Sequence, residues 1–296
     1  MRPVWAQVDL AAIATNVAEL KKLVAPAALC AVVKADGYGH GANEAARAAL
    51  AGGADVLAVA LVGEGAALRA AGIDATVLVL SQASPDELDR LVEVDLDATV
   101  YTESGVQALA AAARRAGRTA TDPVRVHLKV DTGMSRVGAQ PAESVALAQA
   151  VDVEPSVCLA SVFTHCAVAD EPDNPFTDRQ LSLFADVVGQ IEAAGVEVPL
   201  VHAANSAAAI AHPQARLGLV RCGIAIYGLA PAPALAGRVQ LCPALSLRAR
   251  VSHVKRVPAG TGVSYGLTYQ TTTETTLATV PLGYADGVPR RLGAVG

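Results

Sequence analysis

The sequence predicts an α/β fold in which eight parallel strands alternate with helices in a closed barrel, followed by a smaller domain of β-strands. Short apolar runs alternate with Ala-rich stretches over most of the 296 residues, a pattern typical of strand–helix repeats around a parallel sheet. After residue 229 an Ala-Pro-Ala-Pro segment interrupts this pattern. The later runs alternate in polarity without helical stretches between them, which indicates strands and turns.

The expected barrel strands are short apolar runs, and they lie at residues 30–34, 55–61, 75–80, 97–101, 124–130, 158–163, 199–202 and 217–221. The expected helices between them lie at residues 42–50, 64–71, 103–116, 142–151, 178–194 and 206–210, with one more opened by the N-cap Ser84 and Pro85. A doubly wound sheet would also alternate strands and helices. The number of strands favours a (β/α)8 barrel of the TIM type.

We expect three segments along the chain. Residues 1–9 form an N-terminal strand that pairs with the late strands, residues 10–232 form the barrel, and residues 233–296 form part of a C-terminal β-domain. The alternation of residues 244–257 and 275–280 predicts strands of that second domain.

Composition excludes several classes of protein. A net charge of −5 offers no basic surface for nucleic acid. No apolar run reaches the ~18 residues that span a bilayer, and the N-terminus lacks the layout of a signal peptide, so a cytoplasmic protein is expected. The five cysteines are widely spaced and read as reduced thiols. The six histidines lack metal-ligand spacing, so no metal site is expected.

The ends of the expected strands carry the residues that suit chemistry, since barrel active sites gather at the C-terminal ends of strands. Lys34 ends a Val-Val run, where burial would lower the pKa of a lysine and favour Schiff-base formation. The plain alternative is a strand-end lysine that reaches solvent. Asn205-Ser206 and Arg221-Cys222-Gly223 follow the last two strands, a common phosphate site; an N-cap and a glycine turn are the alternative.

Two other strand ends carry polar residues whose roles the sequence leaves open. His165 follows the sixth strand, where a histidine is more often structural than catalytic. Arg136 follows the fifth, and a surface ion pair would explain it equally well.

Seven segments resemble the alanine racemase family: AVVKADGYGHGA, HLKVDTGMSRVG, THCAVADEP, HAANSAA, VRCGIAIYGL, GVSYGLTY and PLGYADGVPRRL. They occur in the family's order, and the resemblance runs from residue 4 to residue 292. It implies a barrel followed by a β-domain, pyridoxal 5'-phosphate as cofactor, L- and D-alanine as substrates, and a homodimer. The implied activity supplies D-alanine for bacterial cell-wall peptidoglycan.

The resemblance also implies roles for single residues. Lys34 matches the lysine that holds the cofactor, and Tyr265 matches the second base, which enters from the partner subunit. Arg221 matches the arginine on the pyridine nitrogen, and His165 lies near the ring. The remaining cofactor-binding positions are Tyr38, Asn205, Ser206, Gly223 and Ile224.

Three further positions are implied around the substrate. Arg136 matches the arginine near the substrate carboxylate, and Tyr284 matches a residue at the entrance. Lys129 matches a lysine that is carbamylated in some members and bonds to that arginine. A protein that removes a proton from one face and returns it on the other needs two bases, which Lys34 and Tyr265 would supply.

The family continues with further strands after the segment Gly-Tyr-Ala-Asp-Gly, whereas this chain ends at Gly296. We therefore expect an incomplete β-domain, weaker cofactor binding and impaired dimerisation. The alternatives are a non-catalytic or impaired cofactor-binding barrel and a racemase of another small amino acid, such as serine.

Overall fold

The computed structural model describes residues 3–294 of the chain. The chain forms two compact units. One comprises residues 9–244, and the other comprises the segment before it, up to Val8, together with the segment from Leu245 onward. No helix in the described residues is long and apolar enough to cross a membrane.

Eight parallel strands form the centre of the larger unit: β2 (Ala28–Val32), β3 (Val56–Val59), β4 (Val77–Val79), β5 (Ala98–Val100), β6 (Val124–Lys129), β7 (Val157–Phe163), β8 (Val201–His202) and β9 (Leu219–Cys222). Their hydrogen bonds give two four-stranded sheets, β4-β3-β2-β9 and β5-β6-β7-β8. Asp97 joins the sheets on one side through backbone bonds with Val77 and Val79, of 2.9 and 3.0 Å. On the other side, the Arg221 N–H donates to the Ala204 carbonyl at 2.9 Å. The ring is therefore closed, and the predicted barrel is confirmed.

Most residues of the strands are apolar because both faces of the strands are largely buried. β9 is buried at all four residues, and four of the five residues of β2 are buried. Polar side chains nevertheless occur inside the unit, and the buried ones include His127, Ser161, His202 and Arg221. This mixed interior becomes important for the site.

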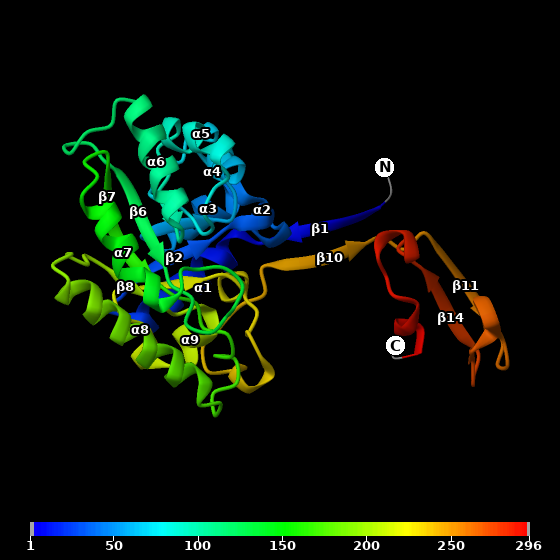
Figure 1. Cartoon of the computed structure of the whole chain (residues 1–296). Helices are drawn as coiled ribbons and strands as arrows, with labels where there is room; N and C mark the ends of the chain where they lie inside the picture. Colours follow the sequence, from blue (N-terminus) through cyan, green and yellow to red (C-terminus); the bar gives the residue numbers. More distant parts are fainter. Residues whose placement is uncertain (1–2, 295–296) are drawn as a thin grey trace. The chain divides into compact units, whose positions relative to one another are not determined.

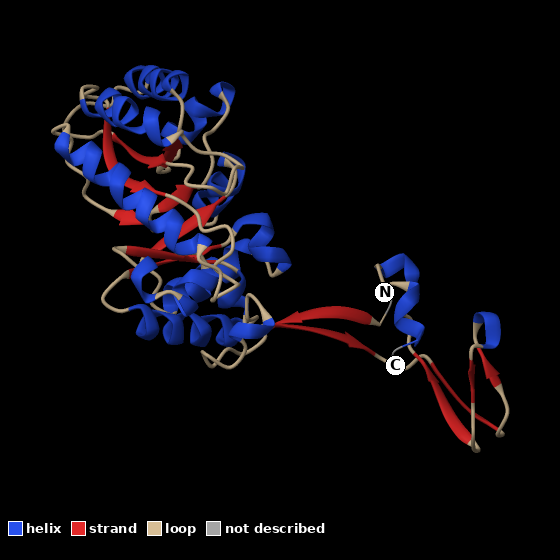
Figure 2. Cartoon of the chain, turned by 60° about the horizontal axis from the view of Figure 1, so that its bottom comes forward, coloured by secondary structure: helices blue, strands red, loops and turns tan. Residues whose placement is uncertain are grey.

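Helices surround the strands in the larger unit (Figures 1 and 2). They are α1 (Leu10–Val24), α2 (Lys34–Gly39), α3 (Ala42–Ala51), α4 (Val62–Ala70), α5 (Leu88–Glu93), α6 (Glu103–Arg115), α7 (Pro141–Asp152), α8 (Phe176–Ala193) and α9 (Ser206–Ala211). The sequence analysis did not foresee α1, which Asp9 caps by accepting a bond from the Ala12 N–H at 3.0 Å. Ser84 precedes the short helix η1 (Pro85–Glu87) as expected, but its hydroxyl bonds to the Glu87 carboxylate at 2.8 Å and caps no backbone N–H.

The smaller unit consists of strand pairs and short turns. β1 (Val4–Val8) pairs antiparallel with β10 (Leu245–Ala249), β11 (His253–Val257) with β14 (Thr275–Thr279), and β12 (Gly262–Val263) with β13 (Tyr269–Gln270). Tyr265 and Tyr284 each begin a short 3-10 helix, η5 (Tyr265–Leu267) and η6 (Tyr284–Asp286). The predicted change from barrel to β-strands is confirmed.

Candidate active site

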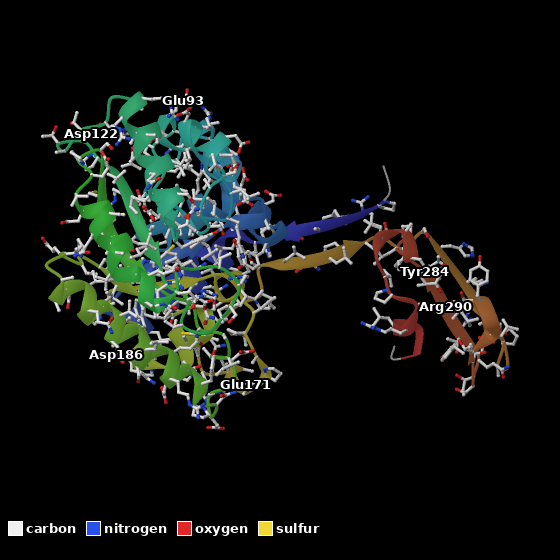
Figure 3. The ribbon with its side chains drawn as sticks, viewed as in Figure 1. Glu93, Asp122, Glu171, Asp186, Tyr284 and Arg290 are labelled. Carbon is white, nitrogen blue, oxygen red and sulfur yellow. The ribbon has the colours of Figure 1, made fainter. Side chains whose placement is uncertain are left out.

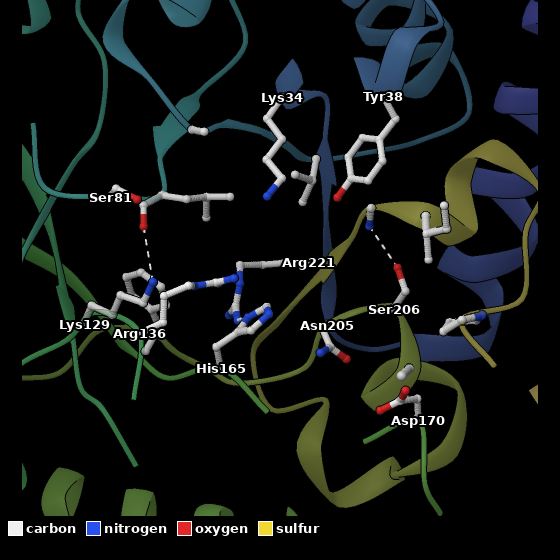
Figure 4. Close-up of a pocket in the computed structure, with 18 residues that line it drawn as sticks. Lys34, Tyr38, Ser81, Lys129, Arg136, His165, Asp170, Asn205, Ser206 and Arg221 are labelled. Atoms are coloured by element: carbon white, nitrogen blue, oxygen red, sulfur yellow. Dashed lines mark hydrogen bonds between the residues drawn. The ribbon is translucent and has the colours of Figure 1, made fainter. Parts of the chain in front are cut away.

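One cavity of about 380 Å³ lies at the C-terminal ends of the barrel strands. This volume falls within the ~300–1,000 Å³ typical of small-molecule sites. Figure 4 shows Lys34 and Tyr38 across the cavity from Lys129 and His165. All ten site residues that the sequence predicted in the barrel line it: Lys34, Tyr38, Lys129, Arg136, His165, Asn205, Ser206, Arg221, Gly223 and Ile224.

Lys34 enters the cavity because an unusual turn follows β2. Ala35, Asp36 and Tyr38 have φ values of 52°, 53° and 54°, in the left-handed region that L-residues rarely adopt. Such strain persists only where the surroundings impose it. Here the Glu64 carboxylate accepts a bond from the Ala35 N–H at 2.6 Å, and the Asp36 carboxylate accepts one from the Ala42 N–H at 2.8 Å. The turn therefore presents Lys34 and Tyr38 on the same side of the cavity.

A second part of the cavity is formed by the loops after β8 and β9. The Gly223 N–H donates to the Ser206 hydroxyl at 2.9 Å, and that hydroxyl is buried (Figure 4). A methyl group added to Gly223 would lie 2.5 Å from the Tyr38 phenol oxygen. Only glycine leaves this space open, so two hydroxyl groups and the backbone approach the same point. Hydroxyl and backbone N–H groups are suitable donors for a phosphate.

Arg221 lies at the base of the cavity and is buried. Its guanidinium donates to His165 Nδ1 at 3.0 Å, so the proton of a neutral His165 must be on Nε2. Burial, followed by the charge of Arg221, holds the pKa of His165 well below its usual range. His165 therefore presents a neutral ring whose Nε2–H remains available as a donor.

Lys129 and Arg136 line another side of the cavity. The Lys129 amine lies 3.5 Å from the Leu80 carbonyl oxygen and 5.5 Å from the centre of the Phe163 ring. Burial, followed by the charges of Arg221 and Arg136, lowers the pKa of Lys129 to about 8. About a tenth of this amine is consequently neutral at pH 7, far more than for an ordinary lysine.

The charge of the cavity defines what it can bind. Its lining carries the basic side chains of Lys34, Lys129, Arg136 and Arg221, and one carboxylate, Asp170. This excess of positive charge favours a ligand with more than one anionic group. A primary amine, a hydroxyl and N–H cradle and a cationic wall together fit pyridoxal phosphate, which carries an aldehyde, a phosphate and a ring nitrogen.

The two predicted site residues of the β-domain stand apart from this cavity lining. Tyr265 is 82% exposed and Tyr284 is 63% exposed, and both belong to the smaller unit; Figure 3 labels Tyr284. The sequence analysis missed Asp170, Ser81 and Phe163, which also line the cavity. Asp170 stands in the quoted segment THCAVADEP, so a signal for it was present.

The fold and the cavity define a class of protein: a barrel whose cationic cavity, beside a lysine at the end of its first strand, suits an anionic small molecule. Comparison with known families makes this specific. The profile "Alanine racemase, N-terminal domain" matches residues 8–231, and "Alanine racemase, C-terminal domain" matches residues 244–296. The chain belongs to the alanine racemase family. Residues 244–296, within the expected β-domain, thus match the C-terminal domain of the family.

Individual relatives agree with this assignment. The chain is 48% identical over 292 residues to the alanine racemase of Symbiobacterium thermophilum, a match that covers 99% of this chain and 76% of the relative. The crystal structure of alanine racemase from D-cycloserine-producing Streptomyces lavendulae superposes with a TM-score of 0.88 at 42% identity, covering 98% of this chain and 76% of that one. The alanine racemase of Bacillus anthracis with bound L-Ala-P gives a TM-score of 0.84 at 37% identity, covering 97% of this chain and 74% of that one.

Proposed function

We propose that this chain interconverts L-alanine and D-alanine with pyridoxal phosphate, using Lys34 and Tyr265 as the two bases. The observation that carries the proposal is the convergence of Lys34, Arg221, His165 and the Ser206–Gly223 cradle on one cavity, in a chain 48% identical to an alanine racemase over nearly its whole length. The product would be D-alanine for cell-wall peptidoglycan in the cytoplasm.

The residues of the cavity divide the binding of the cofactor among them. The Lys34 amine would hold its aldehyde carbon, and Tyr38, Ser206, Gly223 and Ile224 would hold its phosphate, with Asn205 beside them. Arg221 would face the ring nitrogen. When bound, the cofactor supplies an electron sink for the pair left at the α-carbon after a proton is removed.

Proton transfer at two faces falls to Lys34 and Tyr265. Lys34 would take or return the α-proton on its own side. The phenol of Tyr265 would need stabilisation of its anion to act as a base near neutral pH. His165 can provide this, because its Nδ1 is engaged by Arg221 and its Nε2–H is free to donate to the phenolate.

The substrate carboxylate would be bound by Arg136, whose planar guanidinium suits bidentate contact with a carboxylate. Lys129 would support Arg136 once carbamylated, because the carbamate replaces a like charge beside the guanidinium with an opposite one. Tyr284 would lie at the substrate entrance.

We infer that the working form is a homodimer in which Tyr265 comes from the partner subunit. The smaller unit exposes several large apolar side chains, and contiguous exposed apolar surface is typical of interaction sites. They include Leu247 at 58%, Val254 at 58%, Leu267 at 57% and Tyr269 at 58%, besides Tyr265 itself. A second copy of the chain would cover such a surface.

The test measures cofactor binding and turnover separately. The chain is saturated with pyridoxal phosphate, its visible absorption is recorded, and loss of optical rotation is followed with L-alanine and with L-serine. Lys34→Ala should abolish the absorption of lysine-bound cofactor. Tyr265→Phe should retain that absorption and lose most of the racemisation, whereas Tyr269→Phe, a matched exposed phenol, should lose little.

The outcomes separate the competing functions. Absorption without turnover would identify a cofactor-binding barrel that is not a racemase. Faster turnover of serine than of alanine would replace the proposed substrate. Racemisation that survives Tyr265→Phe unchanged would refute the two-base assignment.

A further inference from the structure

Arg221 is a buried cation, and no carboxylate of residues 3–294 contacts it. Its guanidinium donates to His202 Nδ1 at 2.6 Å, to the Thr164 carbonyl at 2.7 Å, and to the Ala203 carbonyl and His165 Nδ1 at 3.0 Å. All four acceptors are neutral groups. Because a charge removed from water is costly unless it is compensated, Arg221 requires a counter-charge elsewhere.

The thiols around Arg221 do not provide that charge. Burial raises the pKa of Cys30 and of Cys222 to about 12, and it also raises the pKa of Cys166. All three are therefore neutral thiols near neutral pH. The Phe163 ring, whose centre lies 5.1 Å from the guanidinium carbon, offers only the partial charge of its face.

Asp97 is the only buried acidic residue among residues 3–294. A continuous chain of hydrogen bonds connects it to Arg221. Asp97 Oδ2 lies 2.9 Å from His127 Nε2, and His127 Nδ1 lies 2.6 Å from the Ser161 hydroxyl oxygen. That oxygen lies 2.9 Å from His202 Nε2, and His202 Nδ1 lies 2.6 Å from Arg221 Nη1.

The positions of the protons in this chain follow from its two ends. A guanidinium can only donate, so His202 Nδ1 accepts and the His202 proton is on Nε2. That proton is donated to Ser161. The structure gives the Ser161 hydroxyl no acceptor other than His127 Nδ1, so the His127 proton is on Nε2 and is donated to the Asp97 carboxylate. Every bond then runs from the cation toward the anion, and no donor is left without an acceptor.

We propose that Asp97 is the counter-charge of Arg221, and that His127, Ser161 and His202 are positioning residues that transmit it through this one-directional chain. The five residues come from or directly before five successive strands, β5 to β9. The hydrogen-bond chain deepens the proposed function, because it fixes the guanidinium that contacts His165 and would face the cofactor ring. Only the catalytic role of this charge pairing rests on the proposed function; the pairing itself does not.

The outer end of the chain is also defined. Arg125 donates to Asp97 Oδ2 at 3.1 Å, but the Arg125 side chain is 55% exposed and its charge is screened by water. The negative charge of Asp97 is therefore only partly offset by Arg125, and it can still compensate the buried charge of Arg221. Asp122, on the loop before β6 (Figure 3), lines a small cavity of about 160 Å³ together with Asp97. Its carboxylate pairs with Arg118 and is not part of the hydrogen-bond chain.

The experiment uses the whole chain with ¹⁵N-labelled histidine at neutral pH, without cofactor. The sequence contains six histidines, so the signals of His127 and His202 are assigned by replacing each of the two with Gln. We expect one proton on Nε2 in both rings. A proton on Nδ1 of His202, or a doubly protonated His202, would overturn the proposal without any further variant.

Three variants then test the transmission of charge. Asp97→Asn keeps an oxygen acceptor for His127 but removes the charge, and it should shift the ring signals of His202. Asp122→Asn removes the same charge beside the same cavity and should leave those signals unchanged. In a Ser161→Ala background, the effect of Asp97→Asn on His202 should fall to less than a fifth.

An Asp97→Asn variant that leaves His202 unchanged would show that Asp97 is not the counter-charge. An effect that survives Ser161→Ala in full would show that the charge acts through space and not along the chain. None of these spectra requires turnover, so a protein without racemase activity would leave this inference intact.

Discussion

Lys129 should react with dissolved carbon dioxide far more readily than an ordinary lysine. Its pKa of about 8, lowered by burial and then by Arg221 and Arg136, leaves about one amine in eleven unprotonated at pH 7. An unperturbed lysine leaves about one in three thousand, so the reactive fraction rises about 300-fold. The amine adds to carbon dioxide and loses a proton, which gives an anion. The surrounding charges of Arg136, Arg221 and Lys34 would stabilise that anion.

The assay is a ¹³C NMR spectrum of the chain in ¹³C-bicarbonate buffer, recorded between pH 6 and pH 9. We expect a carbamate signal that grows as the pH rises toward 8 and that is lost in Lys129→Met. Lys22→Met, which removes an exposed lysine with 72% of its side chain accessible, should keep it. A signal that does not depend on Lys129, or one that develops only near pH 10, would refute the reasoning.

Three other changes should have measurable effects. Gly223→Ala places a methyl group 2.5 Å from the Tyr38 oxygen, so cofactor affinity, measured by an absorption titration, should fall about tenfold. Gly189→Ala adds a methyl group into open space and should leave this affinity unchanged. Asn16→Ala removes hydrogen bonds to the Ile226 and Cys242 carbonyls and to the Cys242 N–H. It should lower the free energy of unfolding, measured in urea titrations, by about 2 kcal/mol. A loss no larger than that of Gln107→Ala, at an exposed position, would contradict this. Lys129→Met should stabilise the bicarbonate-free chain at pH 7 by up to about 3 kcal/mol. Because the folded-state pKa of Lys129 lies below its unfolded value of 10.5, this gain should shrink as the pH rises from 8 toward 10.5, and a constant gain would show that the charge of Lys129 is not its cause.

The barrel could be predicted because its strands carry a strong and local signal. β2, β3 and β4 are short runs of apolar residues, and each is followed by a helical stretch, so their type and order are readable from the chain. The strand ends were equally readable, since the closure of the ring brings every strand end to the same face. Lys34 and Arg221 are far apart in sequence, yet β2 and β9 are neighbours in the sheet.

Features that depend on tertiary contacts were not predictable. The helix α1 buries Asn16 against Ile226 and Cys242, more than two hundred residues away, and no local pattern reveals those partners. The left-handed turn after Lys34 contains Ala35 and Tyr38, which disfavour that conformation alone. Glu64 and Asp36 hold it through side-chain bonds to the backbone, which a propensity argument does not include.

The polar interior of the barrel was the least visible feature, because His127 and His202 occupy ordinary strand positions. Barrel interiors are usually filled by branched apolar side chains, and replacing a buried polar set with apolar residues is often neutral or stabilising. The chain from Asp97 to Arg221 is therefore not needed to fill space. What it adds is His202 Nδ1, one of the four acceptors that hold the guanidinium in one orientation. That orientation determines which nitrogen of His165 carries its proton, and hence which donor the site can offer to the proposed second base.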